Sequence, residues 1–247
     1  IGIAFQKPFD SSRLLLAAFV EGGMAKYHVY ANYGPGHNPA TKADGEFKSI
    51  DFGLIFRQKW DNGIRLEAAA RYGWLYSKFR SDDLLVRNDK DEELPVRFNY
   101  ETPFFAAHLG IGYEHQINEV STLDFVGRYY YTTQRGKTIS IEGHKVTFDG
   151  LESHRVRAGL RYTRAHNPRM SYYVGAYAEH DFSHRATGSV QGLKFRSDKY
   201  GGFTGIGEIG VIFHSTDDRP WNVEAGFQVY GGNVRGFSGG FRFGYQF

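Results

Sequence analysis

The chain offers few side chains whose types and spacing could support catalysis. A water-activating carboxylate or His–Asp pair must place both groups on one face, within hydrogen-bond reach. Asp82 and Asp83 are adjacent in sequence, and so are His180 and Asp181. If these segments are strands, neighbouring side chains point to opposite faces and each pair diverges. The sequence therefore predicts no hydrolytic centre at either pair.

The remaining nucleophiles, bases and metal ligands are equally dispersed. His214 and Ser215 are adjacent, so they too diverge on a strand. His28, His108 and His154 are scattered, and no group of His, Asp and Glu has the spacing of a metal site. The chain has no cysteine, which excludes disulfides, thiolate metal sites and cysteine catalysis. We expect a protein that is not an enzyme and uses no cofactor and no metal.

Alternation of large apolar residues with small or charged ones is the dominant pattern of the chain. In "FAAHLGIGYEH" (105–115), Phe, Ala, Leu, Ile and Tyr occupy the odd positions, and His, Gly and Glu occupy most even positions. A strand sends alternate side chains to opposite faces, so this segment predicts one apolar and one polar face. Similar segments are 50–56, 66–76, 123–131, 155–162, 172–181, 207–213, 221–229 and 239–247.

Composition favours a membrane barrel over a soluble sheet. Aromatic residues make up 17% of the 247 residues, and mean hydropathy is -0.47. No apolar run approaches the ~20 residues of a spanning helix, and the net charge of +3 predicts no nucleic-acid partner. The main alternative is a soluble β-sandwich or lipocalin-like barrel. Against it, the polar faces are rich in Gly and Arg but poor in Lys, Ser and Thr, and aromatic residues gather at strand ends, as in interfacial girdles.

The connections between these segments alternate in length. Short turn-rich joints lie at 61–63, 118–119, 166–169 and 216–220. Long polar stretches lie at 34–48, 80–102, 135–153 and 184–202. Short turns at one rim and long loops at the other are typical of outer-membrane barrels, with the short turns in the periplasm. Within one long stretch, 138–148 alternates as well and predicts a hairpin around "EGH".

We therefore expect one domain over 1–247, a transmembrane antiparallel up-and-down β-barrel in the bacterial outer membrane. Counting back from a C-terminus on the periplasmic side gives eleven strands. Single-chain bacterial barrels use even numbers, so a twelfth strand is expected upstream of Ile1. The alternative is that residues 1–12 form no strand and the barrel has ten.

The polar faces of these strands define the predicted lumen. Acids and bases nearly balance there, and all of the bases are arginines. The paired charges favour salt-bridge ladders that stiffen the wall. The alternative is a charged conduit that contacts a chain in the pore, because inward glycines allow another backbone to approach closely. The predicted lumen-lining residues are Asp51, Arg57, Glu67, Arg71, Glu114, Asp124, Arg128, Arg157, Arg161, Glu179, Asp181, Glu208, Glu224 and Arg242.

The chain resembles the C-terminal translocator barrel of type V autotransporters. The resemblance rests on segments that follow the family order over nearly the whole chain: 50–79 with its "DNG" hairpin, 106–117, 153–163, 172–182 and the terminal "GGFRFGYQF". It implies twelve strands, a helix in the pore and an exported passenger upstream. No self-cleavage is carried over, because the asparagine cleaved in some members would lie upstream of this sequence.

The same resemblance implies the partners of the chain in a Gram-negative cell. They are outer-membrane lipid and lipopolysaccharide, the barrel insertion machinery, and the protein's own upstream passenger or pore helix. The insertion signal would be the terminal aromatic row, Phe241, Phe243, Tyr245 and Phe247. The function of the chain would be to anchor an upstream passenger segment and to support the export of that segment.

Two other classes of barrel compete with this interpretation. Omptin-type proteases have ten strands and need rim residues spaced by two, which Asp82 and Asp83 are not. A small pore or adhesin-like barrel would act through its outer loops, and 80–102 is the best candidate surface for a partner. Open porins need ~16 strands, so a barrel of ten to twelve would be narrow.

Overall fold

The computed structural model describes residues 2–9, 12–31, 41–183, 186–197, 201–216 and 220–245. No helix in these ranges is long and apolar enough to cross a membrane. The strands are β1 (Gly2–Phe9), β2 (Ser12–Ala31), β3 (Thr41–Trp60), β4 (Ile64–Arg87), β5 (Glu93–Asn118), β6 (Ser121–Gln134), β7 (Lys137–Ile141), β8 (His144–Phe148), β9 (Leu151–Asn167), β10 (Met170–Asp181), β11 (Thr187–Val190), β12 (Leu193–Arg196), β13 (Gly202–Phe213), β14 (Trp221–Gly232) and β15 (Gly236–Tyr245).

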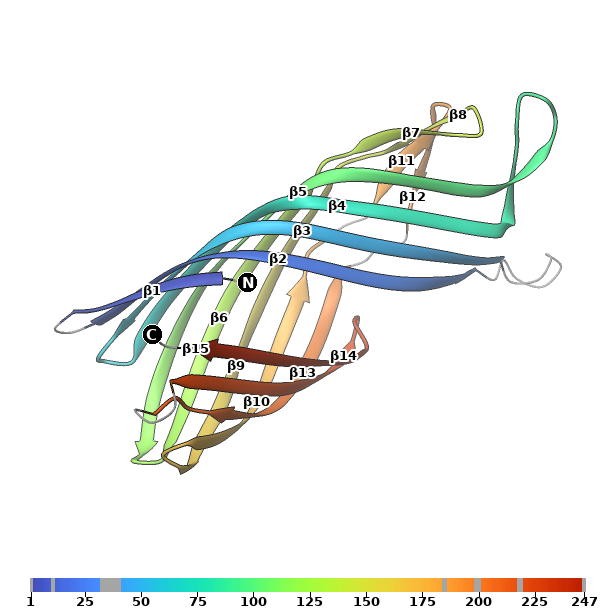
Figure 1. Cartoon of the computed structure of the whole chain (residues 1–247). Helices are drawn as coiled ribbons and strands as arrows, with labels where there is room; N and C mark the ends of the chain where they lie inside the picture. Colours follow the sequence, from blue (N-terminus) through green and yellow to red (C-terminus); the bar gives the residue numbers. More distant parts are fainter. Residues whose placement is uncertain are drawn as a thin grey trace.

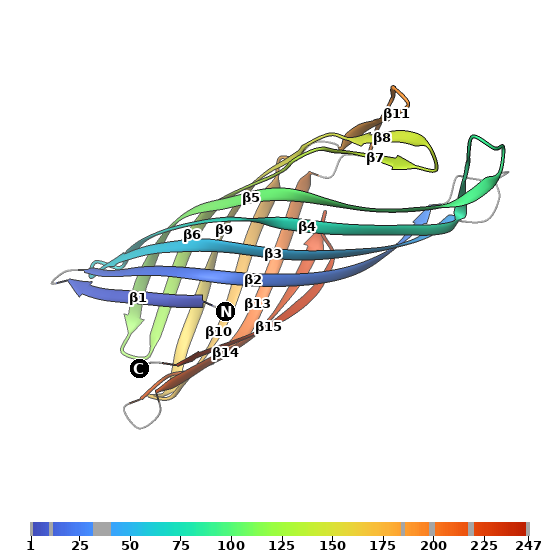
Figure 2. The same cartoon turned by 45° about the horizontal axis from the view of Figure 1, so that its top comes forward.

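Eleven strands form one antiparallel sheet in the order β1-β2-β3-β4-β5-β6-β9-β10-β13-β14-β15. The sheet curls strongly, so that β14 and β15 face back toward β1 and β2 (Figures 1 and 2). This confirms the all-β, up-and-down barrel architecture and the eleven strands counted in the sequence. β1 and β15 form the two edges, and no pairing joins them within the described ranges.

Exposure along the strands is the reverse of that in a water-soluble protein. On β3, Leu54 is 67% exposed whereas Asp51 is only 3% exposed. On β13, Glu208 is buried while its neighbour Ile209 is exposed. Within this belt of the sheet, most outward side chains are apolar and the charged ones point into the concave face, with the period of two that a strand imposes. Lipid is the surrounding in which this distribution is stable.

Aromatic side chains form two bands on the outward face. Near the end with the long connections, the rings of Tyr72 and Trp74 are 5.3 Å apart. On β5, Phe105 belongs to this band and Tyr113 to a second band near the short turns. These two residues are eight positions apart, about 27 Å along a strand. At the 35–45° tilt of outer-membrane strands this length rises about 20 Å, most of the ~25 Å apolar band of such barrels.

Two of the predicted long loops are largely strand. β3 already begins at Thr41, and β4 and β5 remain paired as far as Arg87 and Glu93. The prediction of a loop over 80–102 was therefore wrong, because the hydrogen-bond ladder continues far beyond the apolar belt. Its inner face holds a stack of aromatic rings, with Phe79 and Phe98 5.0 Å apart. The rest of the long connection predicted at 34–48, residues 34–40, lies outside the described residues.

The other two long connections build a second sheet in the order β12-β11-β8-β7. The hairpin predicted for 138–148 is confirmed, with Glu142 and Gly143 at positive φ in its turn. It does not simply prolong the wall, however, since β8 pairs with β11 of the neighbouring hairpin. Phe148 from β8 packs on Phe98 and on Phe195 of β12, with ring centroids 5.9 and 6.2 Å apart. This aromatic cluster attaches the second sheet to the extended β4–β5 hairpin.

The outward face makes a direct prediction for Leu54→Arg. Leu54 lies between the two aromatic bands, where an arginine facing lipid costs about 2–4 kcal/mol. We expect the free energy of unfolding, measured by reversible denaturation in lipid vesicles, to fall by that amount.

Gln228→Arg serves as the matched control for Leu54→Arg. Gln228 points inward and pairs in register with Glu208, so the same new charge should cost less than half as much there. Equal losses for the two variants would contradict the assignment of the faces.

Candidate functional site

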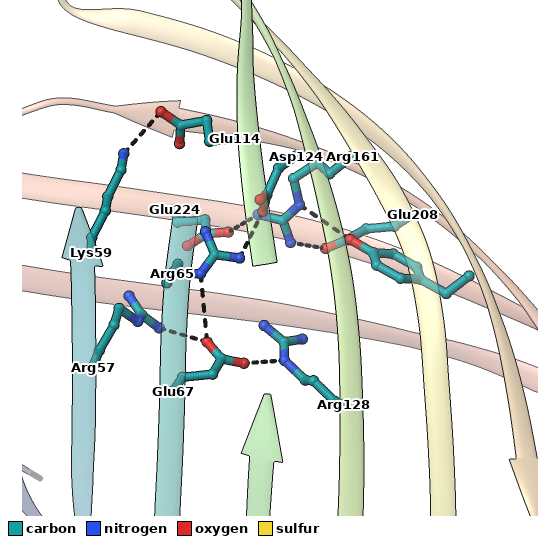
Figure 3. Close-up of polar contacts among 11 residues, drawn as sticks. Arg57, Lys59, Arg65, Glu67, Glu114, Asp124, Arg128, Arg161, Glu208 and Glu224 are labelled. Atoms are coloured by element: carbon teal, nitrogen blue, oxygen red, sulfur yellow. Dashed lines mark hydrogen bonds and ion pairs between the residues drawn. The ribbon is translucent and has the colours of Figure 1, made fainter. Parts of the chain in front are cut away.

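The inner face of the curled sheet carries several groups of ion pairs that cross from strand to strand. Most of the residues predicted to line a lumen belong to it (Figure 3). Register explains why they meet: Arg57 lies directly opposite Glu67, Arg157 opposite Glu179, and Glu224 opposite Arg242. Because inward positions recur at every second residue, side chains from three or four neighbouring strands reach one another.

Glu67 on β4 is the centre of the first cluster. Its carboxylate is 4% exposed and accepts a hydrogen bond from Nε of Arg128 on β6. Arg57 on β3 and Arg65 on β4 lie 3.7 and 3.9 Å from its Oε2. Three guanidinium groups from three strands therefore share one buried carboxylate, whose negative charge holds them together.

Arg161 on β9 is the centre of the second cluster. It lies 2.6 Å from Glu208 on β13 and 3.7 Å from Glu224 on β14. Its guanidinium also covers the ring of Tyr173 at 4.2 Å from the centroid. Glu224 in turn pairs with Arg242 on β15 at 2.9 Å. With Tyr173 on β10, this cluster joins five strands at the C-terminal side of the sheet.

Two contacts that the sequence analysis missed extend the set toward the short turns. Arg65 pairs with Asp124 on β6 at 2.9 Å, and Lys59 pairs with Glu114 on β5 at 2.9 Å. The expectation that no lysine lies among the inward bases was wrong, because β3 keeps its period of two up to Trp60. Continuing the alternation of 50–56 by two more steps would have identified Lys59.

The remaining predicted inner charges fall into separate contacts. Glu179 accepts from Arg157 at 2.7 Å and lies 3.5 Å from Arg155. Arg71 pairs with Glu21 of β2 at 3.2 Å. Asp181 forms no ion pair with another described residue, but it accepts a hydrogen bond from the backbone of Ser183 at 2.8 Å. It therefore shapes the start of the following loop.

Some buried acceptors on this face have no hydrogen-bond partner among the described residues. They are Oδ1 of Asp51, Oδ1 of Asp124 and Oε2 of Glu208. A buried carboxylate oxygen without a donor costs free energy, so water or a donor from another chain segment is expected there. The inner face thus keeps acceptor capacity that its own arginines do not use.

The inward glycines do not leave the open space that the sequence suggested. A Cβ added at Gly210 would collide with the ring of Tyr173, and one at Gly159 would collide with Tyr177. At Gly53 the ring of Phe19 lies over the backbone in the same way. These glycines accept a large side chain from the next strand, so close packing within the wall explains them. On β15, by contrast, nothing lies within 4 Å of a Cβ at Gly240.

The residues considered for catalysis are placed apart. Asp82 pairs with Arg97, and Asp83 accepts from the backbone of Lys42. The sequence analysis missed one Ser–His contact, between Ser171 Oγ and His214 Nε2 at 2.8 Å. No carboxylate in the described ranges hydrogen-bonds this His214, and Ser171 is buried, so the contact ties β10 to the end of β13.

The described part of the chain also contains no group of three or more His, Asp and Glu that could hold a metal ion. In the described ranges the inner face is a surface of paired charges.

Comparison with known proteins supplies the name of this architecture. No family model matches the sequence, and no curated protein matches it. Among solved structures, the β domain of the Bordetella autotransporter BrkA superposes with a TM-score of 0.65 at 14% identity, covering all of this chain and 88% of that one. The fold is that of an autotransporter β domain.

Two further solved structures extend this likeness. The transport unit of the autotransporter AIDA-I from Escherichia coli has a TM-score of 0.63 at 15% identity, over all of this chain and 81% of that one. The translocator domain of the autotransporter NalP from Neisseria meningitidis has a TM-score of 0.60 at 14% identity, over all of this chain and 85% of that one. Identity this low establishes the autotransporter β-domain fold alone.

In this autotransporter-type sheet, Glu67→Gln should be strongly destabilising. The change removes the charge that Arg57, Arg65 and Arg128 share and leaves three cations in contact. We expect a loss of roughly 2–3 kcal/mol in the free energy of unfolding in lipid, below the ~3–5 of a fully buried pair because Arg57 is half exposed.

Glu21→Gln makes the same chemical change in an exposed pair. The side chain of Glu21 is 58% exposed beside Arg71, so the loss should stay under ~1 kcal/mol. Similar losses for Glu67→Gln and Glu21→Gln would show that the cluster around Glu67 does not hold the wall together.

Proposed function

We propose that this chain is the translocator barrel of an autotransporter-type protein. It anchors in the outer membrane and supports export of an upstream segment of its own polypeptide. The observation that carries the proposal is a sheet with an apolar outer face and a charge-balanced inner face. That sheet superposes over its whole length on transport units of autotransporters.

The inner face suits a conduit for an unfolded chain. Its charges are of both signs and mostly satisfied by one another, so a passing segment meets a polar wall without a strong field of one sign. The spare acceptors of Asp51, Asp124 and Glu208 offer hydrogen bonds to backbone or basic side chains. The same residues would hold a segment that rests in the barrel after export.

Closure of the barrel supports a twelfth strand. Since neighbours in the sheet are antiparallel and the count is odd, β1 and β15 run in the same direction. In lipid their free edges must be hydrogen-bonded. One further strand between them, running the opposite way, would complete an all-antiparallel barrel, and we propose that the polypeptide preceding β1 supplies it.

Export can be tested with the full-length protein in Gram-negative cells. An epitope placed upstream of Ile1 should become accessible to protease on intact cells when the barrel is folded in the outer membrane. A folded barrel with the epitope retained in the periplasm would contradict the translocator role and favour a small pore or a loop-mediated adhesin. Conductance in planar bilayers then separates those two.

The C-terminal strand is proposed to be the signal read by the insertion machinery. Phe241, Phe243 and Tyr245 are exposed on the outward face of β15, whereas Phe247 lies outside the described residues. Phe247→Ala should reduce the amount of folded barrel in the outer membrane several-fold, measured by heat-modifiable migration on gels.

Phe237→Ala is the matched control for the insertion signal. Phe237 is on the same strand and face and is 78% exposed, but it lies ten positions before the terminus. Its loss should leave insertion near the wild-type level. An equal reduction for both phenylalanines would mean that only apolar surface matters, not the terminal signal.

A further inference from the structure

The outer face of β2 to β5 changes character sharply along the strands. Four rows of outward residues are apolar, the last of them containing Ile50 and Trp74 in register. The next row places Lys48 beside Tyr76, and the row after it places Lys26, Glu46 and Lys78 side by side. Strand pairing continues through this transition, so the apolar belt leads directly into a charged, hydrogen-bonded wall.

Cations exceed the carboxylates available to them on this wall. The outward cations in the three charged rows are Lys26, Lys48, Lys78, Arg80 and Arg97.

Four carboxylates share this outer face with the five cations, and three of them are engaged; the fourth, Glu101, is on β5 in register with Tyr76. Glu46 pairs with Lys48 at 3.0 Å and Asp82 pairs with Arg97 at 2.9 Å. Oδ1 of Asp44 lies 2.5 Å from Nδ1 of His28.

Three of the outward cations, Lys26, Lys78 and Arg80, surround a shallow hollow without an ion pair of their own in the described part of the chain. Lys78 and Arg80 are two residues apart on β4, about 7 Å along the strand. Lys26 is two strands away from Lys78, about 10 Å across the sheet. The hollow has a volume of about 730 Å³, and Asp44 and Glu46 lie in it as well. The hydrogen bond from Lys48, with Lys26 and Lys78 close by, lowers the pKa of Glu46.

The paired strands on the other side of the barrel lack this basic face. At the same end of β6, β9, β10, β13 and β14, the outward strand positions carry no Lys or Arg within the described ranges; they include Tyr131, His154, His180 and Phe203. The arginines at that end, Arg135 and Arg235, lie in the connections that follow β6 and β14. Strands β2 to β5 are also the ones that extend far beyond the apolar belt. On the inner face of this extension, Phe148 of the second sheet packs on Phe98 of β5, whereas no element in the described ranges packs on the outer face.

We propose that the outer face of β2 to β5 binds lipopolysaccharide, the phosphorylated, multiply acylated lipid of the outer leaflet. Its acyl chains lie against the exposed belt of Ile50, Phe52 and Leu54. Its phosphates lie against Lys78 and Arg80, with Lys26 on the far side of the hollow.

Charge and geometry both fit this occupant. Lysine and arginine bind phosphate through short, charge-assisted hydrogen bonds, and basic groups just outside an apolar belt bind anionic lipid headgroups. A soluble phosphate compound would use the basic rows but not the apolar ones. The proposal rests on the membrane placement proposed above, though not on passenger export.

The test compares Lys78→Gln/Arg80→Gln with Lys194→Gln/Arg196→Gln in the full-length protein. The second variant removes the same charge from β12, whose side chains are exposed on the second sheet. Each protein is extracted from the outer membrane in native lipid discs, and binding of labelled lipopolysaccharide is titrated. We expect roughly tenfold weaker binding for the first variant and wild-type binding for the second.

Further probes distinguish the source of the phosphate. Lipopolysaccharide stripped of phosphate should bind weakly to the wild type and should no longer discriminate between the two variants. Equal binding of intact lipid to both variants would overturn the proposal. So would deacylated lipopolysaccharide or inorganic phosphate that competes as well as the intact lipid, because the apolar rows would then have no role. Surface exposure of the upstream epitope, measured in the same strains, reports separately on the translocator function.

Discussion

The arrangement of this protein depends on satisfying every backbone N–H and C=O without water. In hydrocarbon an unpaired peptide group costs several kcal/mol, so a chain without a spanning helix can cross only as a hydrogen-bonded, closed sheet. The sheet then dictates the side chains, since each strand has one face toward lipid and one toward the interior. The exposure of Leu54 and the burial of Asp51, on opposite faces of β3, follow from that geometry. A low mean hydropathy is compatible with this because only half of the residues meet lipid.

A narrow interior lined by charges creates the second constraint. Burying single charges is costly, so carboxylates and guanidinium groups must meet across strands. Glu67 and Arg161 each collect partners from neighbouring strands, which links distant parts of the wall. Glycine provides the space for this: where Tyr173 lies over Gly210, a larger residue would displace the ring. The inward glycines thus allow bulky aromatic and charged groups to lie flat against the wall.

Strands and faces could be predicted from the sequence because alternation is a local property that each segment carries by itself. The hairpin at 138–148 was predictable for the same reason. Its pairing with β11 was not, because that contact joins segments some 40 residues apart through Phe148 and Phe195 and leaves no local pattern. Specific ion pairs were equally hidden. Whether Arg65 meets Asp124, or Ser171 meets His214, depends on the register between strands, and a shift of one residue would reverse the faces.

Register also limits how the sheet can close. Each pairing from β2 to β15 is continuous except for bulges near Ser81, Gln116 and Met170, so the stagger accumulated around the sheet is already determined. The two edge strands, β1 with eight residues and β15 with ten, run in the same direction. If they paired with each other directly, the seam would be a parallel ladder with slanted hydrogen bonds. An intervening antiparallel strand would restore the perpendicular ladder found everywhere else in the wall. It would also bring an additional inward face beside Gly240, where the interior of β15 is still uncovered. The seam is therefore the part of the wall at which one further strand fits.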